Sequence, residues 1–328
     1  MRLIKHWLRW MVFLTILLAS IGAYYITRPL PLSAIPLQFS LIPGSSLKSV
    51  ARQMQQAGVL SEDWTFVWLT RLSGLSTQIK AGNYQLETAV TLLELMNIVT
   101  QGQVTQNEIS IIEGWTFNQF RTALNTHLAV RHDSIALTER EILQRIGIRE
   151  EQAEGLFFPD TYYFSNGTSD LILLKRAYAT MQQHLQQSWQ TRSAGLPLKS
   201  PYQALILASI VEKETGKTAD RSLIAAVFIN RLRRGMMLQT DPTVIYGLGD
   251  KFDGNLHKRD LHMDTPYNTY TRAGLPPTPI ALPGLAALQA TLHPASSDAL
   301  YFVSRGDGSS EFSATLTQHN RAVNRYQK

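Results

Sequence analysis

The N-terminal part of the chain carries an uncharged run of apolar, small or weakly polar residues, WMVFLTILLASIGAYYI, at positions 10–26. As a helix, a run of this length extends about 25 Å, the short end of what crosses a bilayer. Arg2, Lys5 and Arg9 precede the run, and Arg28 follows it. Because positive charges stay on the cytoplasmic side of a membrane, this pattern predicts a cytoplasmic N-terminus and places the rest of the chain outside.

A cleaved signal peptide is the alternative interpretation of the same run. The run is longer than the usual apolar region of a signal peptide, and no clear A-x-A cleavage site follows it. We therefore expect a cytoplasmic segment at 1–9 and a single-pass anchor at 10–28. In a Gram-negative cell the anchor would lie in the inner membrane and the body of the protein in the periplasm.

Charge and cysteine content exclude several classes of protein. The net charge is +6, but Arg2, Lys5, Arg9 and Arg28 supply +4 of it, which leaves +2 for the rest of the chain. A nucleic-acid binder usually concentrates its basic residues on one face, and no such concentration follows the anchor. The chain has no cysteine, so disulfides, thiolate metal sites and a cysteine nucleophile are excluded.

The rest of the chain divides into a linker and two folded parts. Three prolines in residues 29–38 predict an extended linker. Residues 39–105 open with a turn and a helix that resemble a LysM-like module, a small fold that often binds N-acetylglucosamine polymers; a purely structural subdomain is the alternative. Residues 106–328 interleave helices and short strands without repeated βαβ units, so the predicted fold class is α+β, with this larger part as a mixed α+β catalytic domain.

Several familiar chemistries have no signature here. Phosphate-binding glycine loops, the H-E-x-x-H zinc motif and the G-x-S-x-G nucleophile elbow are all missing from the sequence. The histidines are scattered, and the closest pair, His257 and His262, does not share a helix face. We therefore expect neither a metal nor a cofactor.

One carboxylate stands out because it follows an almost wholly apolar helix. Pro201 opens the segment YQALILASIVEKET after Ser200, a good cap, and the helix should be buried. Glu212 lies on its core-facing side, where desolvation would raise the pKa of the carboxyl. A carboxylic acid kept neutral near neutral pH can protonate a glycosidic oxygen. A solvated residue at a helix end is the ordinary alternative, and Glu214 is the neighbouring candidate.

Polar and aromatic residues gather on the loops that follow this helix. Asn230 lies near the end of the next helix, Gln239 and Asp241 lie in a turn, and Tyr267 and Asn268 lie in a polar-aromatic loop. Aromatic rings offer sugars a flat apolar surface, and amides hydrogen-bond hydroxyl and N-acetyl groups. The set is typical of a saccharide site, although each residue alone is more often a turn former.

Together with further segments of the chain, these residues resemble a known family, the endolytic murein transglycosylases, also called the YceG-like family. The resemblance covers nearly the whole chain and rests on these segments: IEGW (112–115), EGLFFPD (154–160), ASIVEKET (208–215), VFINRL (227–232), LQTDPT (238–243), PYNTY (266–270) and GLPP (274–277). It implies that Glu212 is the catalytic glutamate and that Gln239, Tyr267 and Asn268 line the saccharide cleft. The family often has G-x-H-x-F near the C-terminus, where this chain has GSSEF (308–312), so no histidine role is expected.

The resemblance also implies a reaction and partners. The reaction would be non-hydrolytic cleavage of the MurNAc–GlcNAc β-1,4 bond of nascent peptidoglycan, giving 1,6-anhydroMurNAc ends and terminating strand elongation. Glu214 and Asp241 would support Glu212. The expected partners are peptidoglycan glycan strands, the inner membrane and the peptidoglycan synthases of that membrane. A hydrolytic muramidase, which needs a second carboxylate to place a water, and a non-catalytic glycan-binding scaffold remain as alternatives.

Overall fold

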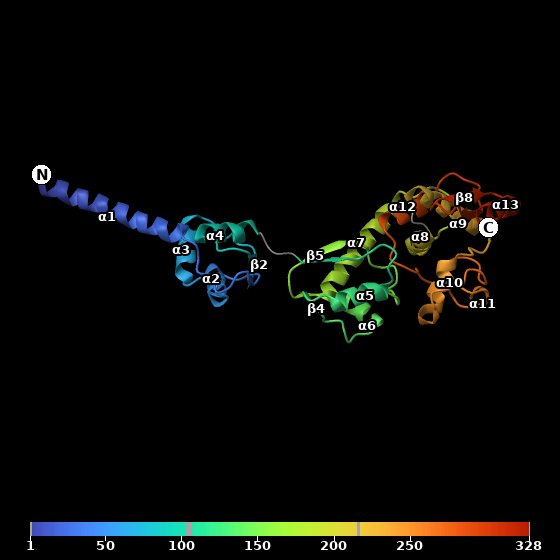
Figure 1. Cartoon of the computed structure of the whole chain (residues 1–328), viewed down its shortest axis with the longest axis horizontal. Helices are drawn as coiled ribbons and strands as arrows, with labels where there is room; N and C mark the ends of the chain where they lie inside the picture. Colours follow the sequence, from blue (N-terminus) through green and yellow to red (C-terminus); the bar gives the residue numbers. More distant parts are fainter. Residues whose placement is uncertain (1, 103–106, 215–216, 328) are drawn as a thin grey trace. The chain divides into compact units, whose positions relative to one another are not determined.

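The computed structural model describes residues 2–102, 107–214 and 217–327. The chain begins with α1 (Arg2–Thr27), a single long helix (Figure 1). Within it, Trp10–Thr27 is apolar and long enough to cross a membrane, and none of this stretch is buried inside the protein. A fold with one N-terminal apolar helix is therefore what the sequence predicted.

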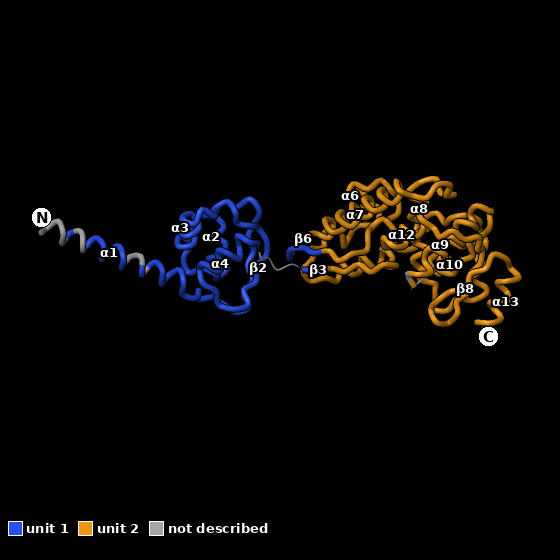
Figure 2. Tube along the Cα trace, turned by 90° about the horizontal axis from the view of Figure 1, so that it is seen from above, with its two compact units in different colours: residues 1–107, 163–166 blue, residues 108–162, 167–328 orange. Residues whose placement is uncertain are grey.

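The chain divides into two compact units, coloured separately in Figure 2. The first contains residues 1–107 together with Tyr163–Asn166, and the second contains Glu108–Tyr162 and the chain from Gly167 onward. The boundary predicted between residues 105 and 106 lies outside the described residues, so the division into 39–105 and 106–328 stays a prediction. The return of 163–166 to the first unit was not expected from the sequence.

After α1, the first unit is a small α+β module. Its elements are β1 (Leu37–Leu41), α2 (Leu47–Gln56), α3 (Asp63–Leu72), β2 (Gly82–Leu86) and α4 (Leu92–Gln101). The strands pair antiparallel, with Phe39 opposite Tyr84, and these two rings stack at 5.2 Å between centroids. Apolar residues alternate along β1, so one face of the strand packs on the core. The LysM-like assignment of this module stays a prediction.

Side-chain caps fix where the helices of this module begin. The Ser46 hydroxyl accepts the Ser49 N–H at the start of α2. Thr91 and Glu94 form a reciprocal capping box at the start of α4, and Gly102 ends that helix with a φ of 73°, a left-handed conformation that glycine adopts without strain.

The second unit is larger and also mixes helices with short strands. Its elements are β3 (Asn107–Ser110), α5 (Phe117–Thr126), β4 (Val130–Arg131), α6 (Glu139–Ile146), β5 (Thr161–Phe164), β6 (Thr168–Ser169), α7 (Asp170–Gln190), α8 (Pro201–Glu214), η1 (Thr218–Asp220), α9 (Arg221–Arg233), α10 (Asp241–Leu248), η2 (Gly249–Lys251), α11 (Lys258–Leu261), α12 (Leu285–Leu292), β7 (Tyr301–Ser304), β8 (Ser310–Ser313) and α13 (Leu316–Tyr326). Strands β3 and β5 cross the boundary, since Asn107 and the last two residues of β5 are assigned to the first unit. The strands form pairs only: β3 with β5, β4 with β6, and β7 with β8. The α+β class is confirmed.

Helix α8 is the centre of this unit. It packs against α7, α9, α10 and α12, and every residue from Ala204 to Val211 is buried. Because neighbouring helices cover α8 on several sides, its sequence is apolar throughout and has no polar face. Asp220 precedes α9 but does not cap it with its side chain, because that carboxylate instead accepts the Ser310 N–H at 2.7 Å.

Candidate active site

Glu212 lies at the point where the buried part of α8 ends. Ser200 caps the start of this helix through the Gln203 N–H, and Pro201 occupies the first helical position. One turn before Glu212, the buried Ser209 hydroxyl accepts the N–H of Ile280 at 3.0 Å. This bond holds the segment leading to α12 against α8, which brings that segment to Glu212.

The Glu212 carboxylate is enclosed and has two polar neighbours. Its side chain is 6% exposed. The Oε2 atom accepts the N–H of Gly284 at 2.9 Å, the residue that caps α12. The Oε1 atom lies 3.5 Å from Nη2 of Arg221, whose side chain is itself 11% exposed. Glu212 is therefore fixed in orientation and keeps an opposite charge close to one oxygen.

A second carboxylate, that of Glu113, approaches the same point of the chain. A Cβ atom on residue 284 would lie 1.8 Å from Oε1 of Glu113, so any other residue at 284 would require the Glu113 side chain to move. The neighbouring backbone is held in place, since Gly114 donates to the carbonyl of Leu282 at 2.9 Å and Leu282 donates to that of Trp115 at 2.7 Å. Glu113 and Glu212 therefore both contact Gly284.

Several opposing effects act on the acidity of Glu212. Burial is the largest and raises the pKa of the carboxyl, and the charge of Glu113 also raises it. The Gly284 hydrogen bond and the positive charges of Arg221 and Lys213 lower the pKa. Since the net direction is upward, Glu212 holds its proton to a higher pH than a solvated glutamate does.

Glu214 and Asp241 belong to a different set of contacts. The Thr240 hydroxyl donates to the Glu214 carboxylate, and burial raises the pKa of that carboxyl, with the charge of Asp241 adding to the increase. Asp241 accepts the hydroxyl of Tyr270 at 2.5 Å. Two predicted support residues thus lie in one cluster at the start of α10, and none of these bonds involves Glu212.

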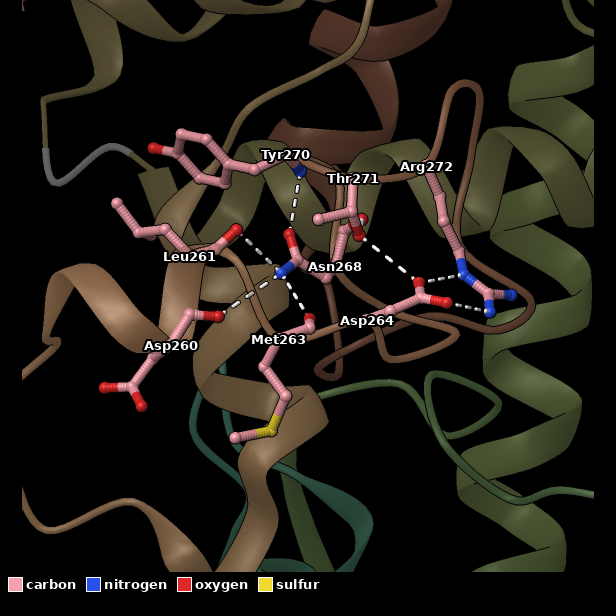
Figure 3. Close-up of polar contacts among 8 residues, drawn as sticks. All are labelled: Asp260, Leu261, Met263, Asp264, Asn268, Tyr270, Thr271 and Arg272. Atoms are coloured by element: carbon pink, nitrogen blue, oxygen red, sulfur yellow. Dashed lines mark hydrogen bonds and ion pairs between the residues drawn. The ribbon is translucent and has the colours of Figure 1, made fainter.

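Asn268 is buried, with 0% of its surface exposed, and its side chain serves the loop that carries it. Its Oδ1 atom accepts the Tyr270 N–H at 2.8 Å. Its Nδ2 atom donates to three backbone carbonyls (Figure 3), those of Asp260, Leu261 and Met263 at 3.3, 3.1 and 2.7 Å. The Asn268 amide therefore holds the backbone of its own loop, and its contact with sugar stays a prediction.

The other two predicted amide residues, Asn230 and Gln239, lie in different environments. Asn230 donates to the carbonyls of Ser297 and Ala299 at 2.8 and 3.1 Å, so its amide holds the loop before β7. Gln239 has an exposed side chain on backbone with a φ of 49°, and it is the one non-glycine residue with positive φ in the described part of the chain. Such strain is tolerated where the surrounding structure imposes it and often marks functional positions.

Tyr267 belongs to a chain of polar contacts that the sequence did not reveal. Its hydroxyl lies 2.9 Å from that of Thr278 and donates to Gln152 Oε1 at 3.3 Å. Its ring meets that of Tyr246 edge to face, and the Tyr246 hydroxyl donates to Oε2 of Glu154 at 3.2 Å. Burial raises the pKa of Glu154 to about 7. Three of these residues, Gln152, Glu154 and Tyr246, line a cavity of about 440 Å³.

The sequence reasoning missed three residues at Glu212: Glu113, Arg221 and Gly284. The signal for Glu113 was present, since it lies in the segment IEGW that carries the family resemblance. Arg221 and Gly284 carried no comparable signal. In the ranges 2–102, 107–214 and 217–327, no group of three or more His, Cys, Asp or Glu side chains could hold a metal ion.

Comparisons with known proteins agree on one family. The model of the YceG-like family matches residues 39–325. An endolytic murein transglycosylase of Bacillus subtilis is 30% identical over 90% of this chain and 86% of its own length. One of Streptococcus pneumoniae is 28% identical over 95% of this chain, which spans 63% of that relative. The structure of a yceG-like protein of Listeria monocytogenes superposes with a TM-score of 0.53 at 26% identity, covering 87% of this chain and 98% of that one. Matched along almost its entire folded length, this chain belongs to the YceG-like family.

Proposed function

We propose that this protein is an endolytic lytic transglycosylase that cleaves the MurNAc–GlcNAc β-1,4 bond within peptidoglycan strands. The observation that carries the proposal is the environment of Glu212, a nearly buried carboxyl whose pKa is raised. A general acid must hold its proton near the working pH and release it to the leaving oxygen. The names of the related proteins support the same reaction class.

In the first step, protonated Glu212 gives its proton to the glycosidic oxygen. The bond between C1 of MurNAc and that oxygen breaks, and an oxocarbenium-like transition state develops at C1. Glu212 becomes a carboxylate that the Gly284 N–H and the Arg221 guanidinium stabilise. The same two groups that lower the pKa of Glu212 therefore stabilise the product of the proton transfer.

In the second step, the C6 hydroxyl of the same MurNAc attacks C1. The Glu212 carboxylate takes the hydroxyl proton, the C1–O6 bond closes a 1,6-anhydro ring, and the acid is regenerated without water. The nucleophile belongs to the substrate, so positioning replaces a second catalytic group. One carboxylate is then sufficient for the whole reaction.

The remaining site residues divide by exposure. Gln239 and Asp241 are exposed and Tyr267 is partly so, and we assign these three to saccharide contacts. Glu214 supports the start of α10 through Thr240. Asn230 and Asn268 shape the surrounding loops through their backbone bonds.

The proposed anchor, α1, would keep the reaction at the membrane. We propose that α1 spans the inner membrane once, with its N-terminus in the cytoplasm and the second unit in the periplasm. The apolar stretch Trp10–Thr27 and the basic residues before it support this topology. An enzyme held at the membrane can release strands as synthases extend them, so membrane-bound peptidoglycan synthases are the proposed partners.

Hydrolysis is the second candidate, and Glu113 is the observation that favours it. This exposed carboxylate contacts the same glycine as Glu212, and a second carboxylate could activate a water molecule. The two reactions leave different ends: a 1,6-anhydroMurNAc end after transglycosylation and a reducing MurNAc end after hydrolysis.

The test is mass spectrometry of glycan ends after incubation of purified peptidoglycan with the protein. We expect internal cleavage with anhydro ends, lost in Glu212→Gln and retained in Glu108→Gln, a matched change at an exposed glutamate on β3. Reducing ends would establish the hydrolase. Turnover near that of the unaltered protein in folded Glu212→Gln would refute Glu212 as the acid.

A further inference from the structure

The outer face of α3 is apolar and open to solvent. Trp64 and Trp68 are each 58% exposed and Leu72 is 80% exposed. These residues recur every four positions, so they form one stripe along the helix, and the exposed Arg71 lies beside it. The opposite side of the helix already serves the core, since Phe66 is fully buried. We call Trp64, Trp68, Arg71 and Leu72 the α3 outer face.

This stripe differs from the scattered apolar residues of an ordinary surface. Single exposed apolar side chains are common, but a contiguous group containing two tryptophans marks a contact with another surface. The rest of the module has its own closed core, to which α3 contributes from its inner side. The outer face is therefore not part of an incomplete core.

The module places this face close to where α1 ends. The chain leaving α1 is tied to the start of α4, because Leu30 donates to the carbonyl of Val90 at 2.8 Å and Pro29 bridges Thr91. Helix α4 contacts both α1 and α3. Figures 1 and 2 show α3 on the side of the module from which α1 emerges, whereas β2 lies on the other side. The α3 outer face therefore lies near the end of the apolar stretch of α1.

The chemistry of the face fits a lipid headgroup region. Tryptophan prefers this zone because its ring is apolar and its N–H is polar. Leu72 adds apolar surface without a hydrogen-bonding group, and the Arg71 guanidinium suits a phosphate. A sugar ligand would need more polar groups than the face offers, since the Trp64 N–H already donates to Glu62. Tyr24 and Tyr25 are exposed near the end of α1 and fit the same zone.

We propose that the α3 outer face lies in the lipid interface of the membrane that α1 spans and holds the small module against its surface. This inference rests on the proposed anchor role of α1 and is independent of the reaction at Glu212. Two attachments, one spanning and one interfacial, fix both the height and the tilt of the module, which a single helix does not.

The chain has no cysteine, so one introduced cysteine labels a single position. Leu72→Cys, carrying an environment-sensitive fluorophore, keeps both tryptophans. Ile42→Cys is the matched control, because Ile42 is an exposed apolar residue, 62% exposed, that follows β1 in the same module. The full chain is reconstituted in vesicles of phosphatidylethanolamine and phosphatidylglycerol, some containing a spin-labelled lipid that quenches fluorescence near the headgroups.

We expect the label at position 72 to be blue-shifted and quenched several-fold more than the label at position 42. Adding Trp64→Gln and Trp68→Gln to Leu72→Cys should reduce that quenching while the protein still floats with the vesicles. Weak and equal quenching at both positions in protein that floats would overturn the inference alone. A shielded label that lipid does not quench, together with disulfide cross-linking between copies of the unlabelled Leu72→Cys protein, would also overturn it. Protein that fails to float would overturn the anchor as well, whereas lost activity in floating protein would concern only the proposed reaction.

Discussion

The ion pair between Arg221 and Glu212 offers a direct test of how the acid is tuned. The two groups lie 3.5 Å apart, and both side chains are nearly buried, so solvent and salt screen their attraction only weakly. An opposite charge at this range lowers a carboxyl pKa by about 1–3 units. In Arg221→Gln the lowering effect of this charge is lost, and the pKa of Glu212 should rise.

The assay is the pH dependence of kcat/KM for release of anhydro ends. Glu212 acts first as an acid, so the rate falls as pH rises through its pKa in the free enzyme. Removing Arg221 favours the neutral carboxyl, and the basic limb of the profile should move to higher pH. The maximal rate should fall, because the guanidinium no longer stabilises the carboxylate formed when the proton leaves.

Two controls isolate the charge. Arg221→Lys keeps a cation at the site and should shift the limb less. Arg234→Gln removes an exposed arginine just past the end of α9, the helix that begins with Arg221. This change should leave the pH profile unchanged. A basic limb that stays in place or moves to lower pH in folded Arg221→Gln would refute the reasoning, because the carboxyl that limits the rate would then not be the one beside Arg221.

Three further predictions concern carboxylates and an amide around the site. Glu113→Gln should move the same basic limb to lower pH, since the charge of Glu113 raises the pKa of Glu212; an opposite shift in the profile would contradict this. Asn268→Ala should lower the free energy of unfolding by about 3 kcal/mol, because buried carbonyls lose their donor; a urea titration that shows a loss below about 1 kcal/mol would count against the positioning role. The folded-state pKa of Glu154 is raised to about 7, so its proton stabilises the fold at low pH, and about 3 kcal/mol is lost as pH rises from about 4.5 to 7. Glu154→Gln should remove that slope, and stability curves that keep it in the variant would place the titrating group elsewhere.

The burial around Glu212 could be predicted because the evidence for it is local in the sequence. An apolar run of helical length that ends in a carboxylate already implies burial, and α8 has that burial. The partners of Glu212 are not local in this sense. Residues 113–115 and 282–284 meet through backbone hydrogen bonds, and their separation along the chain leaves no periodicity that could reveal the contact.

Loop residues were harder to interpret for a different reason. An asparagine on a polar loop looks the same in sequence whether its amide faces a ligand or the backbone of its own loop. Asn268 was predicted to contact sugar, yet its amide lies entirely among backbone carbonyls and an N–H. Composition gives the residue type suited to a site, whereas the direction of a side chain is set by tertiary packing.

The enclosure of Glu212 by segments that are distant in the sequence decides when its carboxyl acquires this environment. Ribosomes make the chain from its N-terminus, so Glu212 is synthesised well before Gly284. A growing chain then has the glutamate without the N–H that binds it or the enclosure that raises its pKa, and its carboxyl is ionised at neutral pH like that of a free peptide. In the proposed mechanism, acid catalysis by Glu212 therefore awaits a nearly complete translated chain.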